Sequence, residues 1–484
     1  MEPKRLRMTN IIALSATDLS AAIAAREVSC VEVMGAYLDR IERLNPAVNA
    51  IVALENRGDL LRQAWKRDEE LRQGQWRGPL HGFPHAVKDL QAVAGITFTR
   101  GSPILKDFVP DADSLMVERL RAAGAIFIGK TNTPEFGLGS HTYNPVYGLT
   151  RNPYDLGKSA GGSSGGAAVA LALKLVPLAD GSDYGGSLRN PAGWNNVCGF
   201  RPSIGRVPTH DRDDWLPSMG VLGPMARNVT DLGLLLSVQA GFDPRAPLSM
   251  ANDPALFAGD LRAEVKGKRL AWLGDFGGFA PCDPGVLATC EAGLKVFEAL
   301  GCVVETAIPA FDLAAVWKAF MTLRHWQSGG ALLDFYRDPA LRALLKPEAV
   351  FEVEKGLGIS AYDITAASVT RSGWSQAVRR LFETYDYMLA PTAQTFAFDA
   401  DQTWPREIAG VAMTTYHEWM KGVCLVTMSG CPSLAVPAGF GEGGLPIGLQ
   451  IIAPPQQDLA CLQLGLAFET AAPWGRDRPP PMAS

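Results

Sequence analysis

The stretch KSAGGSSGGAAVALALKLVPLADGSDYGGSLR, residues 158–189, contains two glycine turns that also carry serine. The first turn is GGSSGG at 161–166 and the second is GGS at 185–187, with an apolar, helix-like run between them. Glycine recurs where the backbone needs a positive φ or a close approach. Two such turns that present hydroxyl groups are typical of a site of nucleophilic attack, where backbone N–H groups stabilise an oxyanion.

Strand-like and helix-like segments alternate along the chain, which predicts an α/β fold. We expect three α/β/α layers with a large central mixed sheet covered by helices, in a single domain over residues 1–484. The helix that opens at the capping box Ser29–Glu32 is expected to end at Pro46. Strands are predicted at 83–87, 125–128, 269–273, 303–307, 387–390, 433–437 and 447–452, and further helices at 60–71, 114–123, 167–175, 230–241 and 284–300.

Residues 311–420 differ from the rest in their many large aromatic side chains. Ligand sites are mostly hydrophobic, with few polar groups. We therefore expect this to be a variable, aromatic-rich substrate-pocket region, in which most aromatics are core and a few line the pocket.

The composition is typical of a soluble globular protein, with 484 residues of which 47% are hydrophobic and 20% charged. The net charge of −5 and the lack of a basic run argue against a nucleic-acid partner. No apolar run reaches the roughly 18 residues of a membrane span, and the N-terminal residues lack the apolar core of a secretory signal. The eight cysteines are scattered without a CxxC pair, which favours free thiols and a cytoplasmic location.

Two motifs match the patterns of other enzyme classes. Residues 124–131, GAIFIGKT, fit the Walker A pattern, but the apolar residues between the glycines predict a strand rather than a phosphate-binding loop. GGSSG at 161–165 fits the G-x-S-x-G pattern of α/β-hydrolases, so a His-dependent esterase with Ser163 as nucleophile is an alternative. Its histidine would come from His210, His325 or His417.

The sequence predicts neither a metal site nor a cofactor. His81 and His85 lie four residues apart, but Gly82 and Pro84 prevent the helix that would join them as a metal pair. No HExxH motif occurs, and no GxGxxG follows a strand.

Three segments remain: GFPHAVKD at 82–89, GGSSGG at 161–166 and GSDYGGSLRNPA at 181–192. Together they resemble the core of the amidase signature family, the serine hydrolases with a Ser–cis-Ser–Lys triad. The resemblance covers roughly residues 20–470. It continues through CGFRPSIGRVP at 198–208, GPMARNVTD at 223–231, GCPSLAVPAG at 430–439 and GLPIGLQ at 444–450.

The resemblance implies a role for each matching residue. The family's nucleophile corresponds to Ser187, its bridging cis-serine to Ser163 and its lysine to Lys88. The oxyanion hole would then consist of the backbone N–H groups of Tyr184, Gly185, Gly186 and Ser187.

Such a triad makes chemical sense because a serine hydroxyl needs a base to take its proton. Lysine can be that base when burial disfavours its ammonium form, and the apolar residues before Lys88 are consistent with burial. Asp89 would hold the ammonium, but in an extended segment its side chain points to the opposite face. Ser163 can relay the proton, and a cis peptide before it would aim its hydroxyl.

Other residues are expected around the triad. Ser164 is predicted to be a structural or substrate-contacting hydroxyl. The resemblance implies that Asp183 and Arg189 brace the nucleophile turn, and that Gly139 and Ser140 lie near the pocket.

Two residues depart from the family pattern around the nucleophile. Tyr184 precedes the GGS turn, where it can narrow the acyl side of the pocket. Asn190 stands where the subunit of the tRNA-dependent amidotransferase often carries Gln. An amidotransferase subunit with an ammonia-channelling partner is therefore another alternative, although residues 205–225 look unlike that branch.

The sequence thus predicts an amidohydrolase that cleaves the C–N bond of a small-molecule carboxamide through an acyl-enzyme on Ser187, without metal or cofactor. The aromatic residues of 311–420 favour an apolar or aryl-substituted amide. The same acyl-transfer chemistry extends to esters and carbamates. A non-catalytic scaffold of the same fold is a further alternative, and a homodimer stays open.

Overall fold

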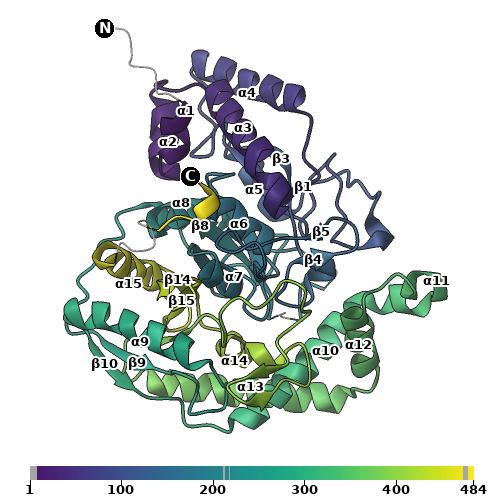
Figure 1. Ribbon diagram of the computed structural model, residues 1–484, viewed down its shortest axis with the longest axis vertical. Helices are drawn as coiled ribbons and strands as arrows, with labels where there is room; N and C mark the ends of the chain where they lie inside the picture. Colours follow the sequence, from purple (N-terminus) through teal and green to yellow (C-terminus); the bar gives the residue numbers. More distant parts are fainter. Residues whose placement is uncertain (1–7, 211–212, 217–218, 473–477, 484) are drawn as a thin grey trace.

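The computed structural model describes residues 8–210, 213–216, 219–472 and 478–483. A mixed sheet of eight strands lies at the centre (Figure 1). β10, β9 and β11 are parallel, and the remaining neighbours are antiparallel. This confirms the predicted α/β fold with its large mixed sheet. The strand order is β10 (Val303–Thr306), β9 (Arg269–Trp272), β11 (Tyr387–Pro391), β15 (Pro446–Ile452), β14 (Ser433–Phe440), β7 (Cys198–Arg201), β8 (Val221–Ala226) and β6 (Ala179–Asp183).

Helices cover both faces of this sheet. Successive side chains of a strand point to opposite faces, so each strand contributes residues to both layers of helices. Leu449 of β15 lies under α9 (Pro284–Ala299), which approaches closely because Gly293 has no side chain. The next residue, Gln450, accepts a hydrogen bond on the other face from Arg189, the first residue of α7 (Arg189–Trp194). α8 (Val229–Gln239) and α15 (Asp458–Ala471) share the first face, and α14 (Lys421–Ser429) shares the second.

A second, smaller sheet lies beside the edge strand β6. Its order is β1 (Ile51–Val52), β3 (Ile126–Thr131) and β2 (Pro84–Lys88), with β2 parallel to β3. The Walker-like segment is therefore a buried strand, as predicted. α6 (Gly165–Ala172) contacts both β3 and β6, so it joins the two sheets, while α3 (Cys30–Val48) and α4 (Arg57–Arg72) cover the small sheet.

Long helices form a further layer over α14 (Figure 1). α10 (Leu313–Arg337) packs against α12 (Pro347–Leu357), α13 (Ala361–Leu381) and α14. The aromatic side chains Phe320, Trp374 and Trp419 of this region are buried in the main hydrophobic core. That core is one continuous cluster of buried residues that extends from Ile11 to Ala472.

Most predicted elements are confirmed within one to three residues, but Pro46 does not end the first predicted helix. α3 continues through Pro46 to Val48 because Val48 is fully buried, and Asn49 ends it in the left-handed conformation. The Asn45 side chain then accepts the N–H groups of the two residues at 50 and 51, at 2.9 and 2.8 Å. The elements that the sequence analysis missed include β6, β7 and β8, and the helices α2, α7, α10, α12, α13, α14 and α15.

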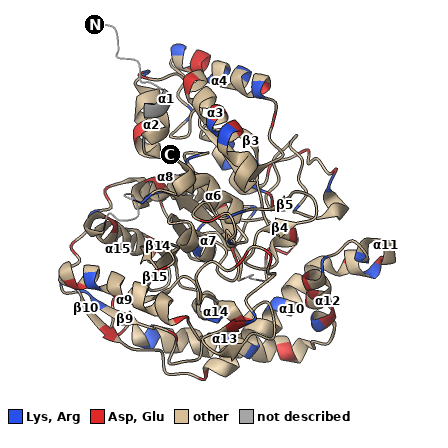
Figure 2. Cartoon of the chain, viewed as in Figure 1, with Lys and Arg blue, Asp and Glu red and all other residues tan. Residues whose placement is uncertain are grey.

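The remaining elements are short or peripheral. Acidic and basic side chains mix along the outer helix α4 (Figure 2). In the described part of the chain, no helix has the length and apolarity that crossing a bilayer requires. The other elements are α1 (Met8–Ala13), α2 (Ala16–Ala24), α5 (Leu115–Ala122), α11 (Pro339–Arg342), β4 (Tyr143–Asn144), β5 (Gly148–Leu149), β12 (Glu407–Ile408), β13 (Val411–Ala412), and the 3-10 helices η1 (Pro103–Leu105), η2 (Glu135–Gly137), η3 (Pro254–Ala258), η4 (Glu418–Met420) and η5 (Pro481–Ala483).

Candidate active site

Lys88 ends β2 with its side chain fully buried between the two sheets. Its Nζ lies 2.8 Å from Ser163 Oγ, 2.7 Å from Ser164 Oγ and 2.9 Å from Ser182 Oγ. The three hydroxyls surround the amine on the side of the GGSSGG turn and β6. Ser164 therefore belongs to the immediate surroundings of the lysine amine.

Burial lowers the pKa of Lys88 from 10.5 to about 7, against the opposing attraction of Asp180 and Asp183. A substantial fraction of the amine is therefore neutral at physiological pH. Asp89 does not hold this amine. Its carboxylate accepts the Thr99 hydroxyl at 2.6 Å, and Lys130 is the cation that it faces.

Side chains from residues 140–142 form hydrogen bonds with the backbone of the GGSSGG turn. The peptide bond between Gly162 and Ser163 is cis. The Gly162 carbonyl accepts the Ser140 hydroxyl, and the carbonyl before it accepts Thr142 Oγ1 at 2.7 Å. Ser140 is thus near the site, as expected, but it acts on the backbone before Ser163.

Asp183 braces the turn that presents Ser187. One of its carboxylate oxygens accepts the N–H of Gly186 at 2.9 Å, and the other accepts that of Leu188 at 3.1 Å. Arg189 donates to both oxygens at 2.9 Å in a bidentate ion pair. This geometry matches the bracing role expected for Asp183 and Arg189.

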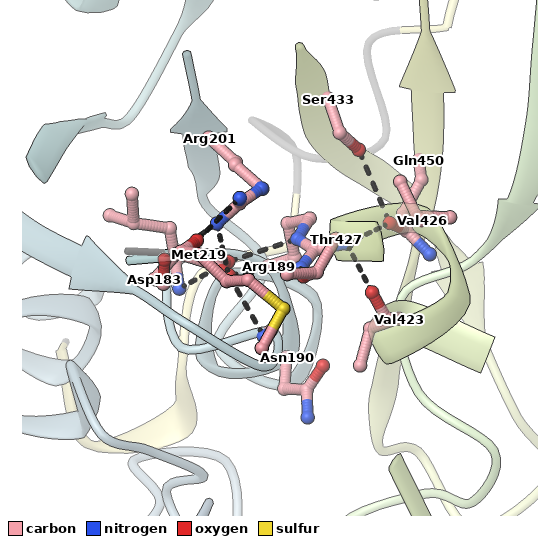
Figure 3. A network of polar contacts seen from close by, with 12 residues as sticks. Asp183, Arg189, Asn190, Arg201, Met219, Val423, Val426, Thr427, Ser433 and Gln450 are labelled. Carbon is pink, nitrogen blue, oxygen red and sulfur yellow. Dashed lines mark hydrogen bonds and ion pairs between the residues drawn. The ribbon is translucent and has the colours of Figure 1, made fainter. Parts of the chain in front are cut away.

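The same ion pair ties the turn to the large sheet and to α14 (Figure 3). Burial alone would raise the pKa of Asp183, but Arg189 and Arg201 outweigh it and hold the pKa far below its usual value. Arg201 also donates to the Asp183 carbonyl at 2.6 Å. Arg189 donates further to Val423 O at 3.0 Å, Gln450 Oε1 at 2.7 Å and Thr427 Oγ1 at 2.8 Å.

The backbone donors of the turn are not equivalent. The N–H of Gly186, implied as an oxyanion donor, is already donated to Asp183. Among the described residues, no protein acceptor faces the N–H groups of Tyr184, Gly185 and Ser187. Three donors rather than four are therefore available to an oxyanion.

Ser163 and Ser187 line one cavity of about 550 Å³, together with Ser182. Gly139 lines it too, as expected. Residues of 311–420 contribute to the lining, but among the described lining residues none is an aromatic of that region, and several of its aromatics are buried in the core. The other walls are Leu90, Phe136, Gly137, Leu138, Tyr184 and Gly185, and the lining residues from 311–420 are Arg324, Ser328 and Met420.

Comparison with known proteins gives the family. The model of the Amidase family matches residues 32–462. The chain belongs to the amidase signature family. This amidase is 34% identical over 477 residues to an acylamidase of Rhodococcus erythropolis, which covers 97% of the chain and 98% of that protein.

Two further relatives differ in their activities. The amidase is 33% identical over 485 residues to a subunit of the glutamyl-tRNA(Gln) amidotransferase of Thermosynechococcus vestitus, over 96% of the chain and 98% of that protein. A solved bacterial aryl acylamidase of the family matches with a TM-score of 0.89 and 30% identity, over 96% of the chain and 97% of its own. The family and these neighbours make the protein an amidohydrolase.

The histidines of the alternative esterase lie elsewhere in the amidase. His325 and His417 both bond to Glu352, at 2.6 and 2.8 Å, in a buried cluster. His210 is exposed and contacts Asp214 at 2.8 Å. The hydroxyl of Ser163 is bonded to Lys88 instead, so the structure does not support a His-dependent esterase.

Sequence reasoning missed several residues of the site. Ser182 contacts Lys88 Nζ, and Asp180 accepts the backbone N–H of Lys88 at 3.2 and 3.3 Å. Both lie on β6, two residues apart, so they share one face of that strand. Recognising residues 179–183 as a strand would have predicted that both face the same neighbour.

Proposed function

We propose that this amidase hydrolyses neutral amides with an apolar or aryl substituent, through an acyl-enzyme on Ser187. One observation carries the proposal. The fully buried amine of Lys88 bonds Ser163 Oγ at 2.8 Å, and Ser163 and Ser187 line the same cavity. The proposed base thus contacts the proposed relay, and the relay and the proposed nucleophile border the same space.

The cavity walls support an uncharged substrate. Leu90, Phe136 and Met420 give the cavity apolar surface. The charge of Arg324 is matched by Glu352 at 2.8 Å, so the guanidinium brings no net charge to the wall. The likeness to an acylamidase and to an aryl acylamidase supports the same substrate class.

The proposed reaction begins with neutral Lys88. Ser187 Oγ attacks the amide carbon while its proton passes to Ser163, and the Ser163 proton passes to Lys88 Nζ. The tetrahedral oxyanion accepts backbone N–H groups at 184, 185 and 187. The Lys88 ammonium returns its proton through Ser163 to the amide nitrogen, the C–N bond breaks, and the amine leaves. Water then hydrolyses the Ser187 ester to the free acid by the same relay.

The test combines labelling with substrate kinetics. A fluorophosphonate should label Ser187, as peptide mapping would show. Ser187→Ala and Lys88→Met should each lower kcat/KM on an anilide by roughly a thousandfold or more. Ser372→Ala, an exposed serine on α13, is the control and should keep full activity. Labelling of another serine, or an active Ser187→Ala variant, would refute the mechanism.

The pH dependence of kcat/KM gives a separate prediction. Since the neutral amine is the base, kcat/KM should rise with pH through the Lys88 pKa of about 7 and level off above it. Measurement on an acetanilide between about pH 5 and about pH 9 would show this limb. A profile that falls with rising pH over this range would contradict a lysine base.

The similarity to amidotransferase subunits supports a second candidate function, that of such a subunit. Such a function would require hydrolysis of glutamine, whose α-ammonium and α-carboxylate both need charged partners. The pairing of Arg324 with Glu352 favours a neutral substrate over glutamine. Glutaminase activity above that on anilides would reverse this order. A chain that neither labels nor hydrolyses any amide, ester or carbamate would instead be a scaffold.

A further inference from the structure

A buried His–Asp pair lies directly beside the proposed base. His85 Nε2 on β2 is 3.0 Å from Asp180 Oδ1 on β6. The exposed fractions of the two side chains are 2% and 0%. The backbone N–H of Lys88 also bonds this carboxylate, at 3.3 and 3.2 Å to its two oxygens. The pair therefore connects the small sheet to the edge of the large one at the residue that carries the amine.

Asp180 needs a compensating cation, because an isolated buried carboxylate is unfavourable. Among the described residues, its hydrogen-bond donors are His85 Nε2 and the Lys88 N–H. A peptide N–H carries no net charge. The closest groups that can carry a compensating charge are the imidazole of His85 and the amine of Lys88, and Lys130 adds a weaker attraction.

The other charged groups around the pair already have partners. Asp183 on β6 is held by Arg189 and Arg201. Lys130 on β3 faces Asp89, with Asp180 and Asp113 as weaker attractions. Arg121 stacks on Phe127, the ring beside His85, and is paired with Asp113 at 2.5 Å.

We propose that His85 is an imidazolium paired with Asp180, and that this pair keeps the amine of Lys88 neutral. Burial already disfavours the ammonium, but an uncompensated Asp180 charge would oppose burial and increase the fraction of ammonium, which cannot accept the Ser163 proton. With it, the pair presents no net charge to the amine. His85 and Asp180 are thus positioning residues that act through Lys88, and the inference rests on the proposed role of Lys88 as base.

The charge on His85 can be measured directly in the wild-type protein. Long-range ¹H–¹⁵N spectra distinguish an imidazolium from both neutral tautomers, and His85→Gln identifies the His85 signals. We expect both ring nitrogens of His85 to be protonated at pH values where the amidase is active. A neutral imidazole there would overturn the proposal.

Kinetics test the effect on Lys88, with opposite shifts expected for the two partners. His85→Gln keeps an N–H donor without the charge, so the limb of the kcat/KM profile should move up by about one pH unit or more. At about pH 7 a shift of one unit corresponds to about a fivefold loss, with the high-pH plateau within about twofold of wild type. Asp180→Asn should move the rising limb of the kcat/KM profile to lower pH. His210→Gln, an exposed histidine, should leave it in place.

The outcomes separate this inference from the function on which it rests. If Lys88→Met is inactive but His85→Gln leaves the limb unmoved or lowers it, the pair has no such role while the lysine base stands. A uniform loss at every pH would make His85 merely structural. If Lys88→Met keeps both activity and limb, the proposed mechanism itself fails.

Discussion

Asp183 shows how much of the site depends on one buried residue. Its carboxylate accepts two backbone N–H groups of the Ser187 turn and two buried guanidinium groups. Removing one partner of a buried ion pair leaves the other charge without compensation. The turn, α14 and β15 are all connected through this one carboxylate and Arg189.

Asp183→Asn should lower the free energy of unfolding by about 3–5 kcal/mol at neutral pH, because two guanidinium groups lose their counter-charge. The pKa of Asp183 is lowered by folding, so its stabilisation is present above the unfolded value of about 3.9 and is lost as pH falls below it. Urea unfolding should therefore show a gap between wild type and variant that narrows below about pH 4. Asp260→Asn, an exposed partner of Arg262, should leave the unfolding midpoint unchanged. An equal gap at every pH would contradict this account.

Among single residues, Lys88, Ser163 and Ser187 could be named as a candidate triad from the sequence through its resemblance to the amidase signature family, and their catalytic roles stay a prediction. The structure adds the Lys88–Ser163 contact to that prediction. His85 and Asp180 could not be predicted as a pair. They lie 95 residues apart on strands of different sheets, and no local pattern relates them.

At the scale of elements, α6 depends on the glycines of the GGSSGG motif. A Cβ at Gly166 would lie 2.4 Å from the backbone N of Asn132 and 2.6 Å from the carbonyl of Ala50. The missing side chain is what lets α6 approach the small sheet. The second pair of glycines in the motif therefore has a packing function, separate from the turn at Ser163.

Gly166→Ala should destabilise the fold by about 1–3 kcal/mol or more, since the clash is with backbone atoms that cannot turn aside. Gly330→Ala is the matched control. Gly330 is an exposed position in α10 where an added Cβ would meet no atom within 4 Å, so alanine there should stabilise by up to about 1 kcal/mol. The midpoints of thermal unfolding of the two variants, compared with that of the wild type, would test this difference. Equal effects of the two substitutions would show that α6 has room for a side chain.

Some elements escaped the sequence analysis for physical reasons. β6 reads ADGSD, which has no β-branched or aromatic residue, and tertiary burial rather than propensity makes it a strand. Pro46 suggested the end of α3, but the helix continues for two more residues to the buried Val48, and Asn49 ends it in the left-handed conformation. The strand at 269–273 was predictable because its apolar run LAWL lies between Arg269 and Gly274, and the strand at 447–452, IGLQII, was predictable because it is mostly apolar.

Across the whole molecule, burial reaches every cysteine. All eight are free thiols in the described residues, and all are buried. Burial raises the pKa of Cys282, Cys424 and Cys431 to about 12, and that of Cys290 and Cys461 well above the usual value. Reaction with a disulfide reagent requires an accessible thiolate.

The native amidase should therefore react with less than about one equivalent of Ellman's reagent, because the thiols are neither exposed nor ionised. In denaturant all eight cysteines of the chain should react. A stopped-flow or manual titration at about pH 8 measures both values. Fast labelling of several thiols without denaturant would show that the core opens readily.

The proposed base and nucleophile come from separate sheets. Lys88 ends a strand of the small sheet, and Ser187 follows the edge strand of the large one. The turnover rate should therefore be sensitive to the relative position of the two sheets. Proton transfer tolerates little misalignment. A substitution far from the cavity that shifts β2 slightly along β6 should therefore lower the turnover rate, while the free energy of unfolding hardly changes.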